Sequence, residues 1–386
     1  MKEVFIKINE YVERHRQEMI DLWEKLVNID SGTANGDGVR EVCTVLRKEM
    51  SAIDMQTKVI ESGPTGPVLV GEWNREANTA PIILIGHMDT VFPDGTAKES
   101  PFRIDEEGRA YGPGVLDMKA GLVIAIYAIK ALQTIGYGKH PIKCVFAGDE
   151  EKIHVKSNAK AILAEEMKGA AAAFNFETGY LDDGLVVGRK GGGMAVLTVH
   201  GVAVHSGIAP EKGRSAILEM SHKIVELESK NNLQRGKLIN CGEITGGTNS
   251  NTIPGECQVV IAFRFPSADI RDEIVADIQT VAAKTHVKGT NAQVNIKAMM
   301  ECMESTEGVL SLFEHVKRTA EECGYGDVHA FTVGGVSDSG IAVTEGVPAV
   351  CAMGVKGSGN HTAEEFAVVE SLFSRTLLAA SSIYTL

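Results

Sequence analysis

Several short segments of this sequence place acidic or histidine side chains at the end of an apolar run or a few residues after it. Those side chains are, in chain order, His87, Asp89, Glu150, Glu151, Glu177 and His361, and Asp117 lies in a glycine-rich segment at 112–119. The apolar runs have the length of buried strands, and sites in open α/β sheets form beyond the carboxyl ends of such strands. Carboxylate and imidazole ligands without cysteine are typical of a pair of zinc, cobalt or manganese ions rather than of a structural zinc ion.

The spacing of these side chains adds detail to this chemistry. Asp89 follows His87 by two residues, so on an extended segment both side chains point the same way. The carboxylate can then accept the second imidazole N–H and fix the tautomer of a metal ligand. Three consecutive carboxylates at 149–151 favour a site in which one binds a cation and its neighbour handles a proton.

Each signal also has a structural explanation when it is taken alone. A single His-x-Asp is common in surface turns, and Gly112–Gly114 predicts a turn. An Asp-Glu-Glu run is common at helix N-termini, because the helix macrodipole favours acidic groups there. The joint placement of all these residues at the ends of apolar runs favours the metal site over these explanations.

A buried sheet must bring these segments together. The first half of the chain alternates helical patterns with short apolar runs, which is typical of an α/β domain. The expected helices span residues 4–27, 38–50, 120–134 and 156–167, and the expected strands span residues 56–60, 67–73, 82–85, 142–146 and 171–176.

The pattern changes near residue 191. Expected strands at 194–199, 237–244, 256–265 and 292–299, with helices at 215–230 and 268–285, follow one another in the order β-α-β-β-α-β. That order describes a ferredoxin-like unit. A helix at 308–323 and strands near 330–333 and 349–354 then resume the first pattern. We therefore expect one α/β domain at 1–190 and 300–386, interrupted by a smaller domain at 191–299.

Composition excludes several classes of function. The chain has 386 residues, a formal charge of −13 and only 5% aromatic residues, so nucleic acid and anionic membranes are not expected as partners. Seven scattered cysteines without a Cys-x-x-Cys pair are typical neither of a disulfide framework nor of a thiolate zinc site. The N-terminus reads as an amphipathic helix rather than a signal peptide, and no apolar run could span a bilayer, so a cytoplasmic protein is expected. Dinucleotide-binding, Walker and serine-hydrolase motifs are also absent.

At these residues, and in their order along nearly the whole chain, the sequence resembles the dinuclear-zinc amidohydrolase/exopeptidase family of glutamate carboxypeptidase, acetylornithine deacetylase, succinyl-diaminopimelate desuccinylase and tripeptide aminopeptidase. The resemblance implies an α/β, zinc-exopeptidase-like catalytic domain with an inserted ferredoxin-like domain. It also implies two metal sites, with the ligands His87 and Glu177 in one, Glu151 and His361 in the other, and Asp117 bridging both. A cis peptide bond between Asp117 and Met118 is implied as well.

The same resemblance assigns roles around these ligands. Glu150 matches the general base, and Asp89 matches the carboxylate that orients His87. In the inserted domain, His205 in the segment 201–207 matches a histidine that helps to stabilise the tetrahedral oxyanion, usually from the partner subunit of a homodimer. The residues that match substrate-binding groups are Asn251, Arg264, Gly335 and Ser337.

These residues, too, have simpler explanations without the family. His205 would be an ordinary loop histidine, and Arg264 would be an arginine whose stem lies on an apolar strand while its head joins a local salt bridge. The segment 334–340 would be a glycine-rich turn. With the family, Arg264 captures a substrate carboxylate. Closure of the inserted domain, hinged near Gly191–Gly193 and Met300, would then exclude water.

The function implied by the resemblance is amide hydrolysis. Two divalent metals, zinc first with cobalt or manganese as alternatives, would share a hydroxide, and Glu150 would act as general base to release a C-terminal amino acid from a peptide or an N-acyl amino acid. Aminopeptidases of the family tend to have Asp at the position of Glu177, which favours the carboxypeptidase or deacylase type. A tripeptide-type aminopeptidase remains the alternative. A non-catalytic binding protein on this fold is a more distant alternative. In such a protein we would expect some of the metal ligands or the general base to be missing.

Overall fold

The computed structural model describes residues 1–386. The chain forms two compact units, each with most of its contacts within itself. Unit 1 comprises Met1–Gly188, Glu304–Val333 and Ser337–Leu386, and unit 2 comprises Arg189–Met303 with Gly334–Val336. The breaks therefore fall at 188 and 303, where the sequence analysis has them at 190 and 299. The short segment Gly334–Val336 belongs to unit 2, which the sequence analysis does not anticipate.

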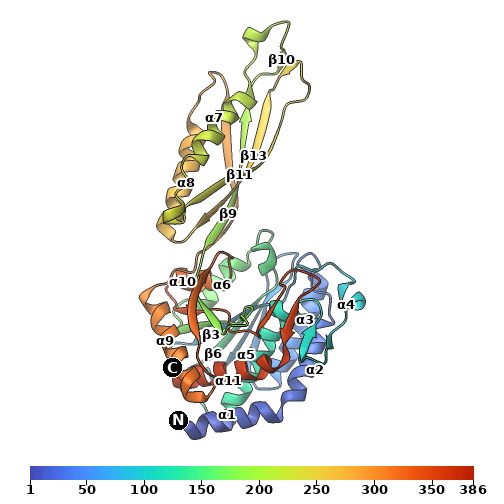
Figure 1. Cartoon of the computed structure of the whole chain (residues 1–386), viewed down its shortest axis with the longest axis vertical. Helices are drawn as coiled ribbons and strands as arrows, with labels where there is room; N and C mark the ends of the chain where they lie inside the picture. The colour runs from blue at the N-terminus through green and yellow to red at the C-terminus, as the bar shows by residue number, and fades with distance from the viewer. The chain divides into compact units, whose positions relative to one another are not determined.

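A six-stranded sheet forms the centre of unit 1 (Figure 1). In spatial order its strands are β1 (Gln56–Glu61), β2 (Pro67–Trp73), β6 (Ile142–Ala147), β3 (Ile82–His87), β7 (Ala172–Asn175) and β16 (Ala349–Val350). β3 pairs in parallel with both β6 and β7, and all six of its residues are buried. The carboxyl ends of these three strands consequently lie at one edge of the sheet, which is where the acidic and histidine residues follow in sequence.

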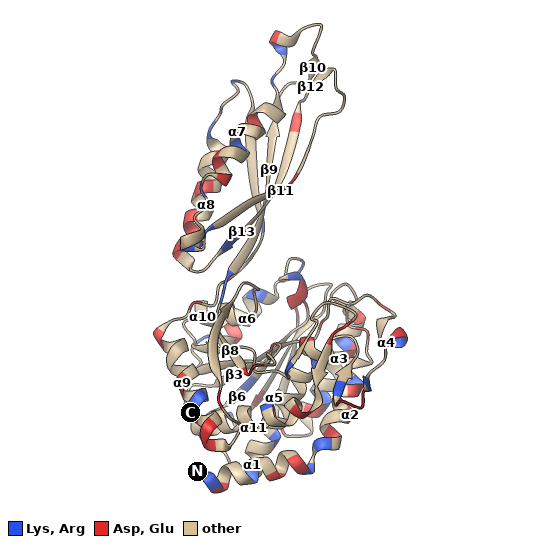
Figure 2. Ribbon diagram, in the orientation of Figure 1, with Lys and Arg blue, Asp and Glu red and all other residues tan.

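Unit 1 also contains helices. They are α1 (Lys2–Arg14), α2 (Arg16–Val27), α3 (Gly36–Ser51), α4 (Thr96–Glu99), α5 (Ala120–Thr134), α6 (Ala159–Met167), α9 (Glu307–Cys323), α10 (Ser339–Thr344) and α11 (Val369–Thr385). Several of them, such as α3, α5 and α6, pack on the six-stranded sheet. α5 carries apolar residues on all sides and is buried along most of its length, as a central helix must be. α1 is amphipathic, and Figure 2 shows acidic and basic residues interleaved along it.

Three predicted elements of unit 1 need correction. The single helix expected at 4–27 is two helices, because His15 has ψ near 15° and its N–H bonds the carbonyl of Val12 instead of continuing the α-helical ladder. The strand expected at 349–354 ends at residue 350, since Ala352 adopts a left-handed φ of 66°. The helix expected from residue 156 begins at residue 159, after a 3₁₀ turn at Glu150–Lys152.

Smaller elements complete unit 1. A second sheet has the order β17 (Gly357–Ser358), β18 (Phe366–Val368), β5 (Arg109–Tyr111) and β4 (Arg103–Ile104), and β15 (His329–Val333) pairs with β8 (Gly184–Arg189). The short strands β17 and β18 frame the loop that carries His361. Each helix of the chain is either too short or too polar to span a lipid bilayer.

Unit 2 is an antiparallel sheet with helices on one face, and it has the predicted ferredoxin-like order. Its strands, in spatial order, are β11 (Leu238–Gly246), β13 (Glu256–Phe265), β9 (Gly191–His200) and β14 (Asn291–Met300); α7 (Ala216–Glu228) and α8 (Ala268–Ala283) are its helices. The short strands β10 (Val204–His205) and β12 (Thr252–Ile253) pair separately. Alternate residues of β9 and β13 are buried in the core of this unit, together with Met220 of α7 and Ile274 of α8.

The glycines at the start of β9 have a packing role. Gly191 and Gly193 pair with β13, and a Cβ atom would lie 2.0 Å from the Phe265 ring at Gly191 and 2.1 Å from the Phe263 ring at Gly193. Only glycine leaves room for these rings. The residues that the sequence analysis assigns to a hinge are thus members of a regular strand.

Candidate metal centre

Five segments of unit 1, one of them the loop between β17 and β18 that carries His361, deliver side chains to the carboxyl edge of the central sheet. His87 is the last residue of β3, and Glu150 and Glu151 follow β6. Glu177 follows β7 by two residues, in the chain that leads away from the sheet. Asp117 lies in the turn Val115–Lys119 that opens into α5, and its peptide bond to Met118 is cis, as the resemblance implies.

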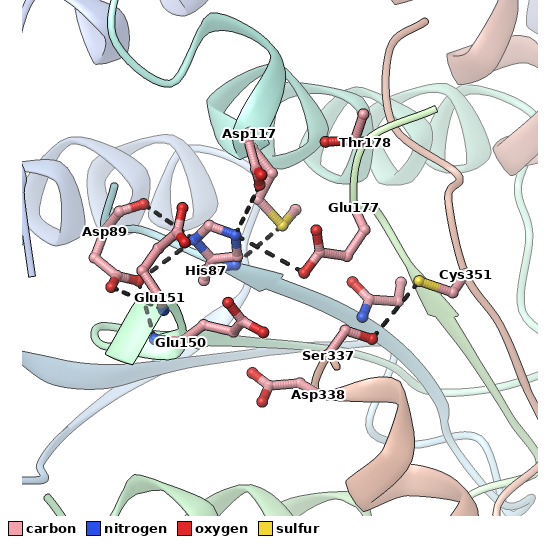
Figure 3. A network of polar contacts seen from close by, with 12 residues as sticks. His87, Asp89, Asp117, Glu150, Glu151, Glu177, Thr178, Ser337, Asp338 and Cys351 are labelled. Carbon is pink, nitrogen blue, oxygen red and sulfur yellow. Dashed lines mark hydrogen bonds and ion pairs between the residues drawn. The ribbon is translucent and has the colours of Figure 1, made fainter. Parts of the chain in front are cut away.

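The first group of side chains surrounds His87. Its Nε2 atom lies 3.2 Å from Oδ1 of Asp117 and 3.8 Å from Oε1 of Glu177, and all three residues are buried. Figure 3 shows the carboxylates of Asp117 and Glu177 directed toward the imidazole. One oxygen or nitrogen from each residue lies within 4.8 Å of the others, so the group could hold one metal ion.

The second group shares Asp117 with the first. Nε2 of His361 lies 3.2 Å from Oδ2 of Asp117 and 3.2 Å from Oε2 of Glu151. One ligand atom from each of the three residues lies within 4.8 Å of the others, so this group too could hold one metal ion. His361 adopts a left-handed φ of 62° in its loop and remains half exposed. The two groups together contain the five residues that the sequence analysis predicts as ligands.

These residues fit a pair of divalent cations. Two ligand atoms of a four-coordinate zinc ion lie about 3.3 Å apart, given zinc–ligand distances of about 2.0–2.1 Å. The shortest separations within the two groups are close to that value. Oε1 of Glu151 is buried and has no hydrogen-bond partner, which is costly for a carboxylate oxygen unless a cation compensates it.

The pKa shifts of the ligand residues and of Glu150 also favour bound cations. Burial raises the pKa of Glu150 well above its ordinary value, and the neighbouring charge of Glu177 adds to this effect. Burial also raises the pKa of Glu151, although the hydrogen bond from His361 opposes it. Hydrogen bonds to Asp117 and Glu151 raise the pKa of His361 to about 10. Without a metal ion, the raised pKa values favour the protonated forms of Glu150, Glu151 and His361. Divalent ions bound at the ligand groups would take the place of protons there.

Asp89 has more partners than the sequence predicts. Nδ1 of His87 lies 3.0 Å from the backbone oxygen of Asp89 and 3.4 Å from its carboxylate. The carboxylate oxygens also accept the backbone N–H groups of Glu150 at 3.1 Å and Glu151 at 3.2 Å, and the hydroxyl of Thr33 at 2.7 Å. Asp89 thus ties the end of β3 to the turn after β6. Figure 3 shows Glu150 within that turn, directed toward His87 and Glu177.

Two supporting residues escape the sequence analysis. Nδ2 of Asn360 donates to Oδ2 of Asp117 at 3.0 Å and to the hydroxyl of Thr178 at 2.6 Å. Oε1 of Glu365 accepts the backbone N–H groups of Leu116 at 2.8 Å and Asp117 at 3.2 Å. Their only sequence signal is proximity to His361, because both act on a segment about 250 positions earlier in the chain.

The remaining predicted residues are divided between the units. His205 and Asn251 belong to unit 2 and meet there, with Nδ2 of Asn251 3.5 Å from Nε2 of His205. Arg264, also in unit 2, donates to the carbonyl of Phe263 in its own strand. The carbonyl of Gly335 accepts a hydrogen bond from Arg189 at 3.2 Å. Ser337 is buried in unit 1, and its hydroxyl oxygen accepts the backbone N–H of Ser339.

The sequence is similar to those of known proteins. A family described as peptidase family M20/M25/M40 matches residues 83–384. Carboxypeptidase G2 of Pseudomonas sp. (strain RS-16) is 26% identical over 95% of this chain and 89% of its own length. Succinyl-diaminopimelate desuccinylase of Psychrobacter arcticus is 26% identical over 93% of this chain and 92% of its own length.

Solved structures agree in fold. Aminopeptidase PepT from Bacillus cereus ATCC 10987 superimposes with a TM-score of 0.76 at 22% identity, covering 96% of this chain and 99% of that one. The M20 metallo-carboxypeptidase Sso-CP2 from Sulfolobus solfataricus gives a TM-score of 0.67 at 16% identity, over 95% and 98% of the two chains. The family match spans most of the chain and includes all five candidate ligands, so this chain belongs to peptidase family M20/M25/M40 and is a metallohydrolase of that family.

Proposed function

We propose that this enzyme hydrolyses an amide bond to release a C-terminal amino acid from a peptide or from an N-acyl amino acid. The observation that carries the proposal is the pair of ligand groups sharing Asp117, with the buried carboxyl of Glu150 beside them. Two metal ions would be held there, zinc first, with cobalt or manganese as alternatives. When bound, they would polarise the scissile carbonyl and lower the pKa of a water molecule.

Glu150 is the proposed general base. Its carboxyl takes a proton from the attacking water and passes it to the nitrogen of the leaving amine. Burial raises its pKa, which suits a group that must both accept and donate a proton near neutral pH. The hydrogen bond from the Glu150 N–H to Asp89 fixes the turn, so the carboxyl does not need to be ordered at the moment of reaction.

The proposed carboxypeptidase or deacylase type is supported by one implication of the family resemblance and by one of the comparisons. Glu177 stands where aminopeptidases of the family tend to have aspartate. The relative named carboxypeptidase G2 is similar over 95% of this chain. The likeness to the aminopeptidase structure, at 22% identity, concerns the fold alone. A tripeptide-type aminopeptidase remains the second candidate. A test of substrates separates the two types.

Unit 2 is proposed to complete the site and to form a homodimer. His205 would stabilise the oxyanion, and Asn251 and Arg264 would bind the substrate, with Gly335 and Ser337 as further substrate contacts. Apolar residues on its surface support pairing. Leu218 and Val225 of α7 are 51% and 71% exposed, and Ile244 of β11, an edge strand, is 54% exposed. Exposed apolar side chains beside an unpaired strand edge are typical of a protein–protein interface.

The test is a hydrolysis screen of metal-loaded protein against N-acyl amino acids, folate-type glutamates, dipeptides and tripeptides. Blocked substrates should be cleaved at the C-terminal residue, and blocking the amine of a tripeptide should not abolish turnover. Cleavage of free-amine tripeptides alone would move the enzyme to the aminopeptidase type. Absence of both metal and turnover after reconstitution with zinc, cobalt or manganese would favour the binding-protein alternative.

A further inference from the structure

A buried histidine outside the ligand groups links two aspartates. His154 is 5% exposed, and its Nδ1 and Nε2 atoms lie 2.8 Å from Oδ1 of Asp149 and 2.8 Å from Oδ1 of Asp338. Both aspartates are 1% exposed. Asp149 directly precedes the proposed base Glu150, and Asp338 lies at the start of α10. The imidazole therefore connects the turn after β6 with a segment nearly 190 positions later in the chain.

Both ring nitrogens of His154 must donate protons. Each faces a carboxylate oxygen, which accepts hydrogen bonds but cannot donate one when ionised. Burial alone lowers the pKa of His154, but the charge of Asp338 and the hydrogen bonds to both aspartates outweigh it and raise the pKa well above the ordinary value. His154 is thus an imidazolium between two carboxylates, and it compensates charges that would be costly to bury alone.

The backbone is bent to bring this ring back to Asp149. Ile153 and His154 adopt φ values of 48° and 56°, a left-handed region that is a genuine outlier for a β-branched residue such as isoleucine. The N–H of Ile153 bonds the carbonyl of Glu150 at 2.7 Å, and the N–H of His154 bonds the carbonyl of Asp149 at 3.2 Å. The turn that carries the base is therefore closed by the histidine that follows it.

The second aspartate faces the base. Figure 3 shows Asp338 beside Glu150, and its negative charge acts on the Glu150 carboxyl. Oδ2 of Asp338 is buried without a hydrogen-bond partner, so His154 is the cation that compensates this carboxylate. Asp149 is further held by the hydroxyl of Thr65 at 3.0 Å.

We propose that His154 is a positioning residue for the general base: by bridging Asp149 and Asp338 it fixes the turn that carries Glu150 and offsets the negative charge that Asp338 presents to it. The effect on turnover rests on the proposed function. The prediction that His154 is an imidazolium, hydrogen-bonded to both aspartates, does not rest on the proposed function, because it concerns the protein without metal or substrate.

The first test measures the imidazolium directly. Ring ¹⁵N chemical shifts of the histidines are recorded on the metal-free protein between pH 6 and 9, and the His154 signals are assigned by their loss in His154→Gln. Two protonated ring nitrogens across this range are expected. A neutral tautomer with one protonated nitrogen at pH 7 would overturn the proposal, whether or not the enzyme cleaves any substrate tried. If the variant does not fold, isotope labelling of the wild-type protein with assignment through the rings' neighbours gives the same answer.

The second test separates positioning from simple packing. His154→Gln leaves Asp338 buried without a cation, so kcat should fall about 10-fold to 100-fold with little change in KM and with metal content retained. Adding Asp338→Asn removes the uncompensated charge and should restore part of kcat. His329→Gln, at an exposed position of unit 1, is the matched control and should behave as wild type. An unchanged kcat in His154→Gln, or a double variant no better than the single one, would overturn the proposal.

Discussion

His87 and His361 contact the two oxygens of a single carboxylate. Nε2 of His87 lies 3.2 Å from Oδ1 of Asp117, and Nε2 of His361 lies 3.2 Å from Oδ2. Each histidine then has a glutamate of its own, Glu177 for His87 and Glu151 for His361. Asp117 is consequently the point at which two otherwise separate ligand groups become one centre.

Adjacent glutamates should show different defects. Glu150→Gln removes the proposed base but no ligand, so kcat should fall by about 10²–10⁴-fold while metal content stays at the wild-type level. Glu151→Gln weakens a ligand, so it should lose metal as well as activity. Steady-state kinetics and metal analysis of both dialysed variants check this. A Glu150→Gln enzyme with wild-type kcat would refute the general-base assignment.

The stability of the metal-free protein should depend on Glu365. Burial raises the pKa of Glu365 from 4.5 to about 8, so between these values the folded state holds a proton that the unfolded state has released. Stability contributed by this group is therefore present below pH 4.5 and is lost as the pH rises toward 8, by about 1.4 kcal/mol for each pKa unit.

Glu365→Gln removes this loss while keeping an oxygen for the backbone N–H groups of Leu116 and Asp117. In the presence of chelator, the Tm of the variant should therefore rise relative to that of wild type between pH 5 and pH 8.5. Thermal unfolding at both pH values gives the comparison. An identical Tm difference at both would show that Glu365 does not titrate in this range.

Gly193 should be required for packing. A Cβ added to Gly193 would lie 2.1 Å from the Phe263 ring, so Gly193→Ala should lower the free energy of unfolding by about 1–3 kcal/mol. Gly138→Ala is the control, since nothing lies within 4 Å of a Cβ at that position. Denaturant unfolding of both variants decides the matter. Equal stability in the two variants, with a reduced kcat in Gly193→Ala alone, would favour a hinge.

A homodimer through unit 2 should be disrupted by charge on its exposed apolar residues. Val225→Asp and Ile244→Lys together place charges on α7 and on the edge strand β11, and sedimentation should then show a monomer. Leu181→Asp, at an exposed apolar residue of unit 1, should leave the dimer intact. Wild-type protein that sediments as a monomer at all concentrations would contradict the proposed pairing.

Local patterns predicted much of the fold. The helix at 120–134 and the strand at 256–265 occur with the predicted bounds, because a long apolar run and a strict alternation each favour one structure. The break at His15 and the early end of β16 at Val350 could not be predicted, since single backbone torsions decide them.

The site follows the same rule. Most candidate ligands lie near the ends of apolar strands, and the edge of a parallel sheet gathers such residues, so a metal site could be predicted there. Asp117, in a glycine-rich segment, and the division of the ligands between two ions were implied only by the family resemblance. Glu365 could not be predicted, because its partners, the N–H groups of Leu116 and Asp117, are brought to it only by the folded chain. His154 gave no signal either. Its two aspartates come from segments that the sequence separates by nearly 190 positions.

The most direct test of this account is the metal stoichiometry of the protein, measured by titrating zinc into the chelator-treated chain. Wild type should bind two ions per chain, His87→Ala and His361→Ala should each lose one high-affinity site, and Asp117→Ala should lose both. Two high-affinity sites that persist in Asp117→Ala, or a wild-type chain that binds no second ion, would contradict a centre built on a shared Asp117.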